Sequence, residues 1–217
     1  MERIIAPSLL SADFSCLGSE VEMINRSAAD WFHVDVMDGV FVPNISFGFP
    51  VMDVLKRYAR KPLDVHLMIT HPERYVERFA DAGAWSISFH LEAVEDPRPI
   101  LDLIRKKGCR TCLAVNPDID VERLYPYLQD VDMVLLMSVY AGYGGQRFIE
   151  DTWERLRKLR HAIQERQLPT LIEVDGGVTT QNAASLFEEG VAALVAGSSV
   201  FKAPVPETAI AELKGFA

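Results

Sequence analysis

The stretch Trp31-Phe-His-Val-Asp-Val-Met37 alternates apolar and polar side chains, as a β-strand with two different faces does. Successive side chains of a strand point to opposite faces, so His33 and Asp35 share one face and the apolar residues between them share the other. The stretch Leu63-Asp-Val-His-Leu-Met68 repeats the pattern and puts His66 near the end of its polar face. Each run therefore predicts a strand that helices cover on its apolar face and that carries polar side chains on its inner face.

Short apolar runs of this kind recur along the whole chain, and a helix-like segment follows each of them. We expect eight strands, at residues 4–8, 31–35, 63–68, 85–89, 110–115, 133–137, 170–174 and 193–196. Helix signals lie between them: Asp96-Pro97 opens a helix that ends near Gly108, and Thr70-His-Pro-Glu73 opens one that ends near Gly83. Eight strand–helix units in 217 residues predict a closed parallel (β/α)8 barrel, the TIM barrel of the α/β class.

The chain is expected to form a single domain over residues 1–217. No low-complexity stretch and no linker rich in proline, glycine or serine interrupts the alternation. An open doubly wound sheet would usually have fewer units, or a glycine-rich dinucleotide-binding turn after its first strand. No such turn follows residues 4–8, which favours the barrel.

Charge and hydropathy exclude several classes of partner. The net charge is −9, the pI is near 5.1, and no run of lysines and arginines could neutralise several phosphates, so we expect neither nucleic acid nor an anionic membrane surface as a partner. No apolar stretch approaches the roughly 20 residues of a spanning helix, and the first residues lack a secretion signal, so a cytoplasmic protein is expected. Cys109 and Cys112 lie in a strand-like run, where reduced structural thiols are expected.

Four polar side chains fall on inner strand faces at carboxyl ends: His33, Asp35, His66 and Asp175. Branched aliphatic residues usually fill a barrel, so these positions need a reason. Two imidazoles and two carboxylates form a ligand set for one divalent metal ion, Zn²⁺, Fe²⁺, Mn²⁺ or Co²⁺. The alternative is a metal-free network in which these groups satisfy one another. Three methionines at inward strand ends serve either as core filler or as an apolar lid over the metal: Met37, Met68 and Met137.

Glycine-rich turns follow the last three expected strands: Gly142-Tyr-Gly-Gly-Gln146, Gly176-Gly177 and Gly197-Ser-Ser199. Glycine lets backbone amides approach an anion closely, and barrels often bind phosphate with the loops after strands seven and eight. The turns therefore predict a phosphate site that does not depend on net charge. The alternative is that such turns simply favour glycine.

Other polar residues receive structural interpretations. Asp38 precedes Gly39 in a turn, where an aspartate most often caps the local backbone. His71, His90 and His161 have no comparable partners by spacing, so we expect ordinary surface or packed histidines.

Several motifs in order along the chain resemble those of the ribulose-phosphate 3-epimerase family. They are Ala6-Pro-Ser8, His33-Val-Asp-Val-Met-Asp-Gly39, Phe41-Val-Pro-Asn44, Asp64-Val-His-Leu-Met68, Glu173-Val-Asp-Gly-Gly177 and Val195-Ala-Gly-Ser198. The resemblance implies an isomerase of the pentose phosphate pathway that interconverts D-ribulose 5-phosphate and D-xylulose 5-phosphate with one metal ion per subunit. It also implies a small phosphorylated ketose as partner and a homo-oligomer, either dimer or hexamer.

The same resemblance assigns roles to individual residues. It implies that His33, Asp35, His66 and Asp175 bind the metal, and that Asp35 and Asp175 are the catalytic acid and base. Substrate and its phosphate would contact Ser8, His66, Gly142, Tyr143, Gly144, Gly145, Gly176, Gly177, Gly197 and Ser198.

One stretch departs from the family, which usually reads Asn-Pro-Gly-Phe-Gly-Gly-Gln where this chain has Tyr140-Ala-Gly-Tyr-Gly-Gly-Gln146. Loss of proline is expected to loosen the loop backbone, and Tyr140 with Ala141 is expected to alter affinity or sugar preference. Three rival functions stay open: a D-allulose 6-phosphate 3-epimerase, a metal-free phosphate-binding barrel and an inactive scaffold barrel.

Overall fold

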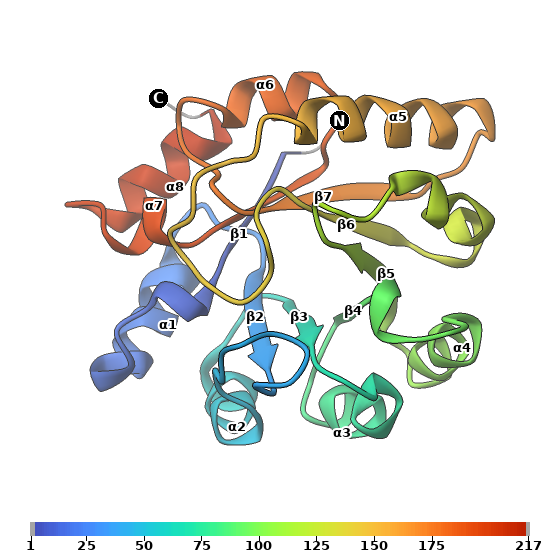
Figure 1. The fold of residues 1–217 in the computed structure, drawn as a ribbon. Helices are drawn as coiled ribbons and strands as arrows, with labels where there is room; N and C mark the ends of the chain where they lie inside the picture. The colour runs from blue at the N-terminus through green and yellow to red at the C-terminus, as the bar shows by residue number, and fades with distance from the viewer. Residues whose placement is uncertain (1–2, 216–217) are drawn as a thin grey trace.

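Eight parallel strands form the centre of the protein in a computed structural model that describes residues 3–215 (Figure 1). They are β1 (Ile4–Pro7), β2 (Phe32–Met37), β3 (Leu63–Met68), β4 (Ser86–His90), β5 (Arg110–Val115), β6 (Met133–Met137), β7 (Leu171–Asp175) and β8 (Ala193–Ala196). The hydrogen-bonded order is β1-β8-β7-β6-β5-β4-β3-β2. A parallel bridge between Ser8 and His33 joins the two end strands, so the ring is nearly closed. The predicted (β/α)8 barrel is confirmed.

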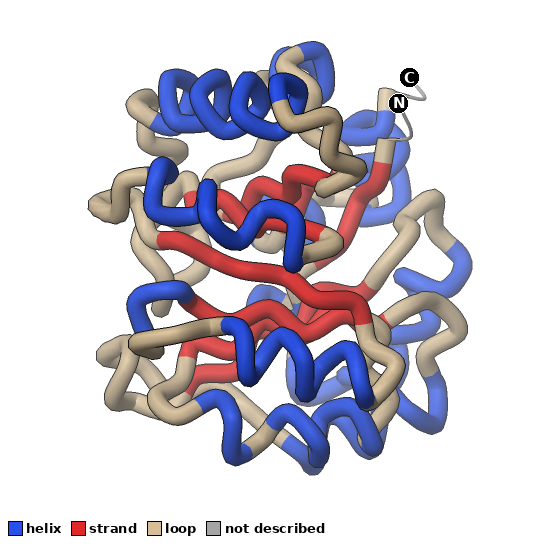
Figure 2. The backbone as a smooth tube through the Cα atoms, turned by 90° about the vertical axis from the view of Figure 1, so that its right-hand side faces the viewer, coloured by secondary structure: helices blue, strands red, loops and turns tan. Residues whose placement is uncertain are grey.

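Helices surround the strands, as the ribbon and the tube both show (Figures 1 and 2). The α-helices are α1 (Leu17–Arg26), α2 (Phe49–Tyr58), α3 (Val76–Asp81), α4 (Arg98–Lys106), α5 (Thr152–Glu165), α6 (Ala183–Glu188), α7 (Ser198–Phe201) and α8 (Pro206–Lys214). Short 3-10 helices are η1 (Leu9–Ser11), η2 (Phe14–Cys16), η3 (Pro72–Arg74), η4 (Leu91–Ala93) and η5 (Val121–Asp130). No helix within residues 3–215 is long and apolar enough to cross a membrane.

Two helical segments differ from the sequence-based expectation. The segment after β5 is the 3-10 helix η5, which contains Pro126; proline lacks the N–H that an α-helix interior requires. The helix expected from Thr70 onward is divided into η3 and α3, and His71 adopts a left-handed conformation with φ 53° just before η3. The rule of one α-helix after each strand therefore holds only approximately.

The core has two parts, one on each side of the barrel wall. Apolar residues such as Phe32 and Val34 pack under the helices, whereas Met68 and Cys112 belong to the smaller cluster that fills the barrel. Cys109 belongs to the outer part, and both cysteines are buried free thiols, as expected. The alternation read from the sequence therefore sorts side chains between the two parts.

Candidate active site

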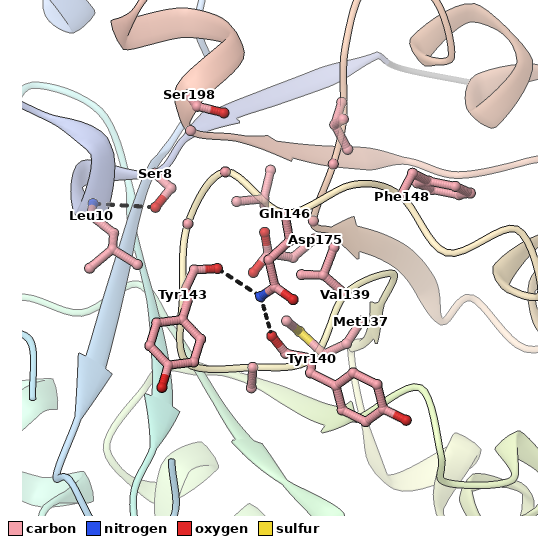
Figure 3. A pocket seen from close by; sticks show the side chains of 18 of the residues that line it. Ser8, Leu10, Met137, Val139, Tyr140, Tyr143, Gln146, Phe148, Asp175 and Ser198 are labelled. Atoms are coloured by element: carbon pink, nitrogen blue, oxygen red, sulfur yellow. Dashed lines mark hydrogen bonds between the residues drawn. The ribbon is translucent and has the colours of Figure 1, made fainter. Parts of the chain in front are cut away.

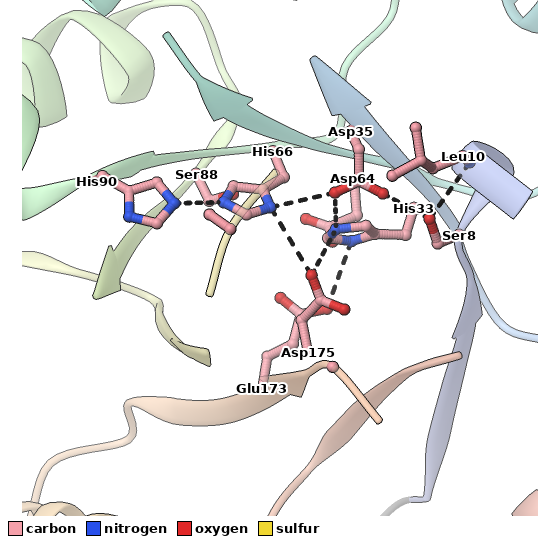
Figure 4. A network of polar contacts seen from close by, with 12 residues as sticks. Ser8, Leu10, His33, Asp35, Asp64, His66, Ser88, His90, Glu173 and Asp175 are labelled. Carbon is pink, nitrogen blue, oxygen red and sulfur yellow. Dashed lines mark hydrogen bonds and ion pairs between the residues drawn. The ribbon is translucent and has the colours of Figure 1, made fainter. Parts of the chain in front are cut away.

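Four side chains from three strands meet at one end of the barrel (Figure 4). β2 supplies His33 and Asp35, β3 supplies His66, and Asp175 is the last residue of β7. Each offers one nitrogen or oxygen atom, and these four atoms lie within 4.8 Å of one another. The structure therefore brings together the residues that the sequence predicts as metal ligands.

His33 presents its Nε2 atom to this cluster. That atom lies 3.3 Å from Asp35 Oδ1 and 3.9 Å from Asp175 Oδ2, and it has no hydrogen-bond partner although it is buried. The other ring nitrogen, Nδ1, lies 2.6 Å from Asp64 Oδ2. A carboxylate that accepts from one ring nitrogen leaves the lone pair of the other free for a metal. The unpartnered Nε2 and the mixed nitrogen and oxygen donors fit a divalent cation.

His66 presents the opposite nitrogen, Nδ1, to the same point. Nδ1 lies 3.3 Å from Asp35 Oδ1 and 3.9 Å from Asp175 Oδ2. Its Nε2 lies 2.9 Å from His90 Nε2, away from the cluster. Both imidazoles are completely buried, so their orientation is fixed by these contacts.

The two aspartates have opposite electrostatic environments. Burial tends to raise the pKa of Asp35, but the positive charge of His33, with a smaller effect of His66, outweighs it and holds this pKa well below its usual range. Ser8 Oγ also donates to Asp35 Oδ2 at 2.5 Å. Burial, together with the neighbouring charge of Asp35, raises the pKa of Asp175 to about 7. In the metal-free protein, the pair therefore favours one ionised and one protonated carboxyl group below about pH 7, as a two-base acid–base site requires.

A cavity of about 500 Å³ adjoins the cluster, and Figure 3 shows side chains that line it. Asp35 and Asp175 lie in its wall, whereas His33 and His66 are not among its lining residues. Its wall includes most of the residues that the family resemblance implies as substrate contacts: Ser8, Gly142, Tyr143, Gly144, Gly145, Gly176, Gly177, Gly197 and Ser198. The three methionines Met37, Met68 and Met137 also line it and are buried. Substrate could therefore reach both carboxyl groups.

Packing alone explains two of the glycines. A Cβ atom at Gly176 would overlap the side chain of Val139, and one at Gly177 would overlap the backbone of Phe148. Both residues also have positive φ, 118° and 61°. At Gly176 and Gly177, local packing and backbone conformation alone account for glycine. At Gly145, a Cβ atom would have no neighbour within 4 Å.

The loop of residues 140–147 is tied to the barrel at several points. Gln146 Nε2 donates to Tyr140 O at 2.7 Å and to Tyr143 O at 2.9 Å (Figure 3). Asn44 Nδ2 donates to the carbonyl of Gly142 at 2.7 Å. The Ala141 N–H donates to Asn116 Oδ1 at 3.0 Å, a bond that proline could not make. Loss of proline therefore adds a tether at the position where we expected only loosening.

His90 is one of the site residues that sequence reasoning missed. It is completely buried, and it bonds to His66 and, through Nδ1, to Glu92 Oε1 at 2.9 Å. The sequence could have indicated it, because polar and apolar side chains alternate in Ser86-Ile-Ser-Phe-His90 as in the other strands. Ending the expected strand at residue 89 removed His90 from the inner face. His90 is not an ordinary packed histidine.

The remaining polar residues behave as predicted. Asp38 Oδ1 accepts from Val40 N and Phe41 N, both at 2.8 Å, which confirms the backbone cap. His71 and His161 have side chains 62% and 71% exposed, which confirms ordinary surface positions.

Comparison with known proteins gives a consistent family. A model described as "Ribulose-phosphate 3 epimerase family" matches residues 4–201. The ribulose-phosphate 3-epimerase of Synechocystis sp. is 46% identical over 213 residues, which cover 97% of this chain and 93% of that protein. The Bacillus subtilis protein of the same name is 41% identical over 212 residues, 97% of this chain and 98% of that protein.

Solved structures with low sequence identity share the fold. KGPDC from Streptococcus mutans matches with a TM-score of 0.72 at 13% identity, covering 100% of this chain and 97% of that one. A tryptophan synthase α-subunit from Pyrococcus furiosus matches with a TM-score of 0.73 at 17% identity, covering 99% and 98%. These likenesses establish the barrel alone, because one fold supports many chemistries.

Proposed function

Because the chain belongs to the ribulose-phosphate 3-epimerase family and is an isomerase, we propose that it interconverts D-ribulose 5-phosphate and D-xylulose 5-phosphate. The observation that carries the proposal is the placement of Asp35 and Asp175. They reach one cavity from β2 and β7, and their pKa values are shifted in opposite directions. Inversion at a carbon requires one group to remove a proton and another to return one on the opposite face.

We assign the divalent cation to four atoms: His33 Nε2, His66 Nδ1, Asp35 Oδ1 and Asp175 Oδ2. When bound, such a cation would supply positive charge that offsets the negative charge developing on the substrate oxygens. Asp64 orients His33 by accepting from its Nδ1–H. The ligand chemistry admits Zn²⁺, Fe²⁺, Mn²⁺ or Co²⁺.

In the proposed reaction, the ionised Asp35 removes the proton on carbon 3 of D-ribulose 5-phosphate. The adjacent carbonyl accepts the electron pair, which gives an enediolate. Asp175, which enters the step in its protonated form with its other oxygen toward the cation, then donates to the opposite face of carbon 3 and yields D-xylulose 5-phosphate. The two aspartates exchange roles in the reverse direction. Ser8 Oγ donates to the Asp35 carboxylate and holds it in place.

The phosphate group is assigned to the loops after β7 and β8. Gly177 lines the cavity after β7, and Gly197 and Ser198 line it at the start of the short helix α7. Barrels of this class commonly bind phosphate at that position through backbone N–H groups. This assignment reconciles an anionic substrate with a chain of net charge −9.

The test replaces each aspartate by its uncharged isostere. We expect Asp35→Asn and Asp175→Asn to abolish epimerisation, because neither amide can exchange the proton. The matched control is Asp53→Asn, at an exposed position on α2. Turnover is measured in both directions, and exchange of the carbon-3 hydrogen with deuterated solvent is followed by NMR. Near-normal turnover in either variant would refute the assignment.

Two further measurements separate the rival functions. Catalytic efficiency on D-allulose 6-phosphate should fall well below that on D-ribulose 5-phosphate; the reverse order would transfer the activity to the six-carbon sugar. Activity should disappear after exhaustive chelation and return with added metal. Unchanged activity in metal-free protein would favour the metal-free barrel.

A further inference from the structure

A buried chain of side chains extends from His66 away from the cavity (Figure 4). His66 Nε2 lies 2.9 Å from His90 Nε2, and His90 Nδ1 lies 2.9 Å from Glu92 Oε1. The ring planes differ by only 24°, with centroids 5.0 Å apart. That separation, with a short contact between the two nitrogens, means that the rings meet edge to edge in nearly one plane. The geometry suits an N–H···N hydrogen bond between the imidazoles.

The contacts of Glu92 determine which imidazole donates in the hydrogen bond between His66 and His90. Glu92 Oε1 accepts from Asn116 N at 3.0 Å and from Asn116 Nδ2 at 2.8 Å, so this oxygen is an acceptor. His90 Nδ1 lies 2.9 Å from this oxygen but 3.5 Å from Asn116 Nδ2, so it carries a hydrogen that points to Glu92. In neutral His90 the other nitrogen, Nε2, then has a lone pair and accepts from His66. His66 consequently carries its hydrogen on Nε2, and its Nδ1 lone pair faces Asp35 and Asp175.

The contact with Asp35 favours the other tautomer of His66. Asp35 Oδ1 lies 3.3 Å from His66 Nδ1, and a carboxylate at that position favours a hydrogen on Nδ1. A hydrogen there would occupy the lone pair that a metal requires. We propose that His90 and Glu92 are positioning residues that hold His66 in the Nε2–H tautomer and keep Nδ1 available to the divalent cation. The proposal rests on the proposed function, which places the cation at this cluster.

Neighbouring residues hold His90 and Glu92 in place. The ring of Phe41 lies 4.8 Å from that of His90, measured between centroids. Asn116, which donates to Glu92, is itself held by two further hydrogen bonds: Arg155 Nη2 donates to its carbonyl at 2.8 Å, and Ala141 N donates to its Oδ1. The acceptor oxygen of Glu92 is thus fixed by a residue that also contacts the loop of residues 140–147.

The first test measures zinc affinity by competition with a chromophoric chelator. His90→Phe keeps an aromatic ring but removes both nitrogens, and we expect zinc affinity to fall about 10–100-fold. His90→Gln, whose amide can accept from His66 and donate to Glu92, should recover most of that loss. When the activity of His90→Phe is titrated against free zinc, the midpoint should move to higher zinc concentration by the same factor. Activity at saturating zinc should return toward the parent value.

The matched control breaks a similar contact on the surface. His71 and Glu73 are also two residues apart, 3.3 Å from Nδ1 to Oε1, and both side chains are exposed. Glu73→Gln should leave zinc affinity unchanged, whereas Glu92→Gln should lower it. Equal affinity in the parent and His90→Phe would overturn the positioning role alone. A parent protein that binds no divalent cation would overturn the proposed metal site as well.

The second test reads the tautomer directly and does not depend on the variants folding. In zinc-loaded parent protein, ¹⁵N NMR of the imidazoles should show neutral His90 with its hydrogen on Nδ1 and His66 with its hydrogen on Nε2. A hydrogen on His90 Nε2, or a doubly protonated His90, would reverse the hydrogen bond and overturn the inference.

Discussion

At the scale of single residues, Asp35 and Asp175 share one chemistry but differ in their surroundings. In the metal-free protein, the charge of protonated His33 and the hydroxyl of Ser8 stabilise the ionised form of Asp35. Asp175 is disfavoured as an anion first by burial and then by the negative charge of Asp35 beside it. The division into base and acid therefore comes from neighbours rather than from residue type.

This difference predicts a pH-dependent stability in metal-free protein. The pKa of Asp175 is raised from 3.8 to about 7, so ionisation of this group costs the folded state stability as the pH rises through that interval. Asp175→Asn cannot ionise. Its advantage in melting temperature over the parent should grow from pH 4 to 7 and then level off, as followed by calorimetry after chelation. Parallel melting curves across that interval would contradict the raised pKa.

At the scale of elements, the loop between β6 and α5 forms much of the cavity wall without regular structure of its own. Gln146 closes it by donating to two of its carbonyls, and Ala141 and Gly142 tie it to Asn116 and Asn44. Side-chain bonds to backbone therefore take the place of a helix or strand here.

Gln146→Ala should loosen this loop. Two carbonyls lose a donor, at about 1 kcal/mol each, so we expect KM for the phosphorylated ketose to rise several-fold while zinc affinity stays constant. The control is Gln164→Ala at an exposed position on α5. Steady-state kinetics and amide hydrogen exchange of residues 140–147 are the measurements. An unchanged KM with unchanged exchange would show that the loop does not depend on Gln146.

At the scale of the whole molecule, the four proposed ligands connect β2 and β3 with β7. β2 and β3 are paired with each other, but neither is a neighbour of β7, which is hydrogen-bonded to β6 and β8. A cation bound there links two parts of the barrel wall through its ligands. β2 also lies at one end of the strand order, where the Ser8–His33 bridge closes the ring.

Metal removal should therefore lower global stability. A ligand at 100 times its Kd stabilises the folded state by about 2.7 kcal/mol, and each kcal/mol moves the melting temperature of a chain of this length by about 2–4 °C. We expect chelation to lower the melting temperature by about 5–10 °C and stoichiometric metal to restore it. Identical melting curves with and without metal would argue against binding at the cluster.

The sequence by itself determined the barrel and the residues at its centre. Alternation in β2 and β3 sorted each strand into two faces, so the pattern alone places His33, Asp35 and His66 inside the barrel. Asp175 followed from the same reasoning at the end of β7. These inferences are local, because the period of a strand fixes where each side chain points.

The tertiary structure alone decided which inner residues touch. In the β3–β4 register His66 pairs with Ser88, which brings His90, 24 residues away in sequence, within reach of the His66 ring. Register between neighbouring strands and the rotation of buried rings depend on packing around the whole barrel, which no local pattern encodes. The same holds for Ala141 and Asn116, whose hydrogen bond joins loops from two different strands.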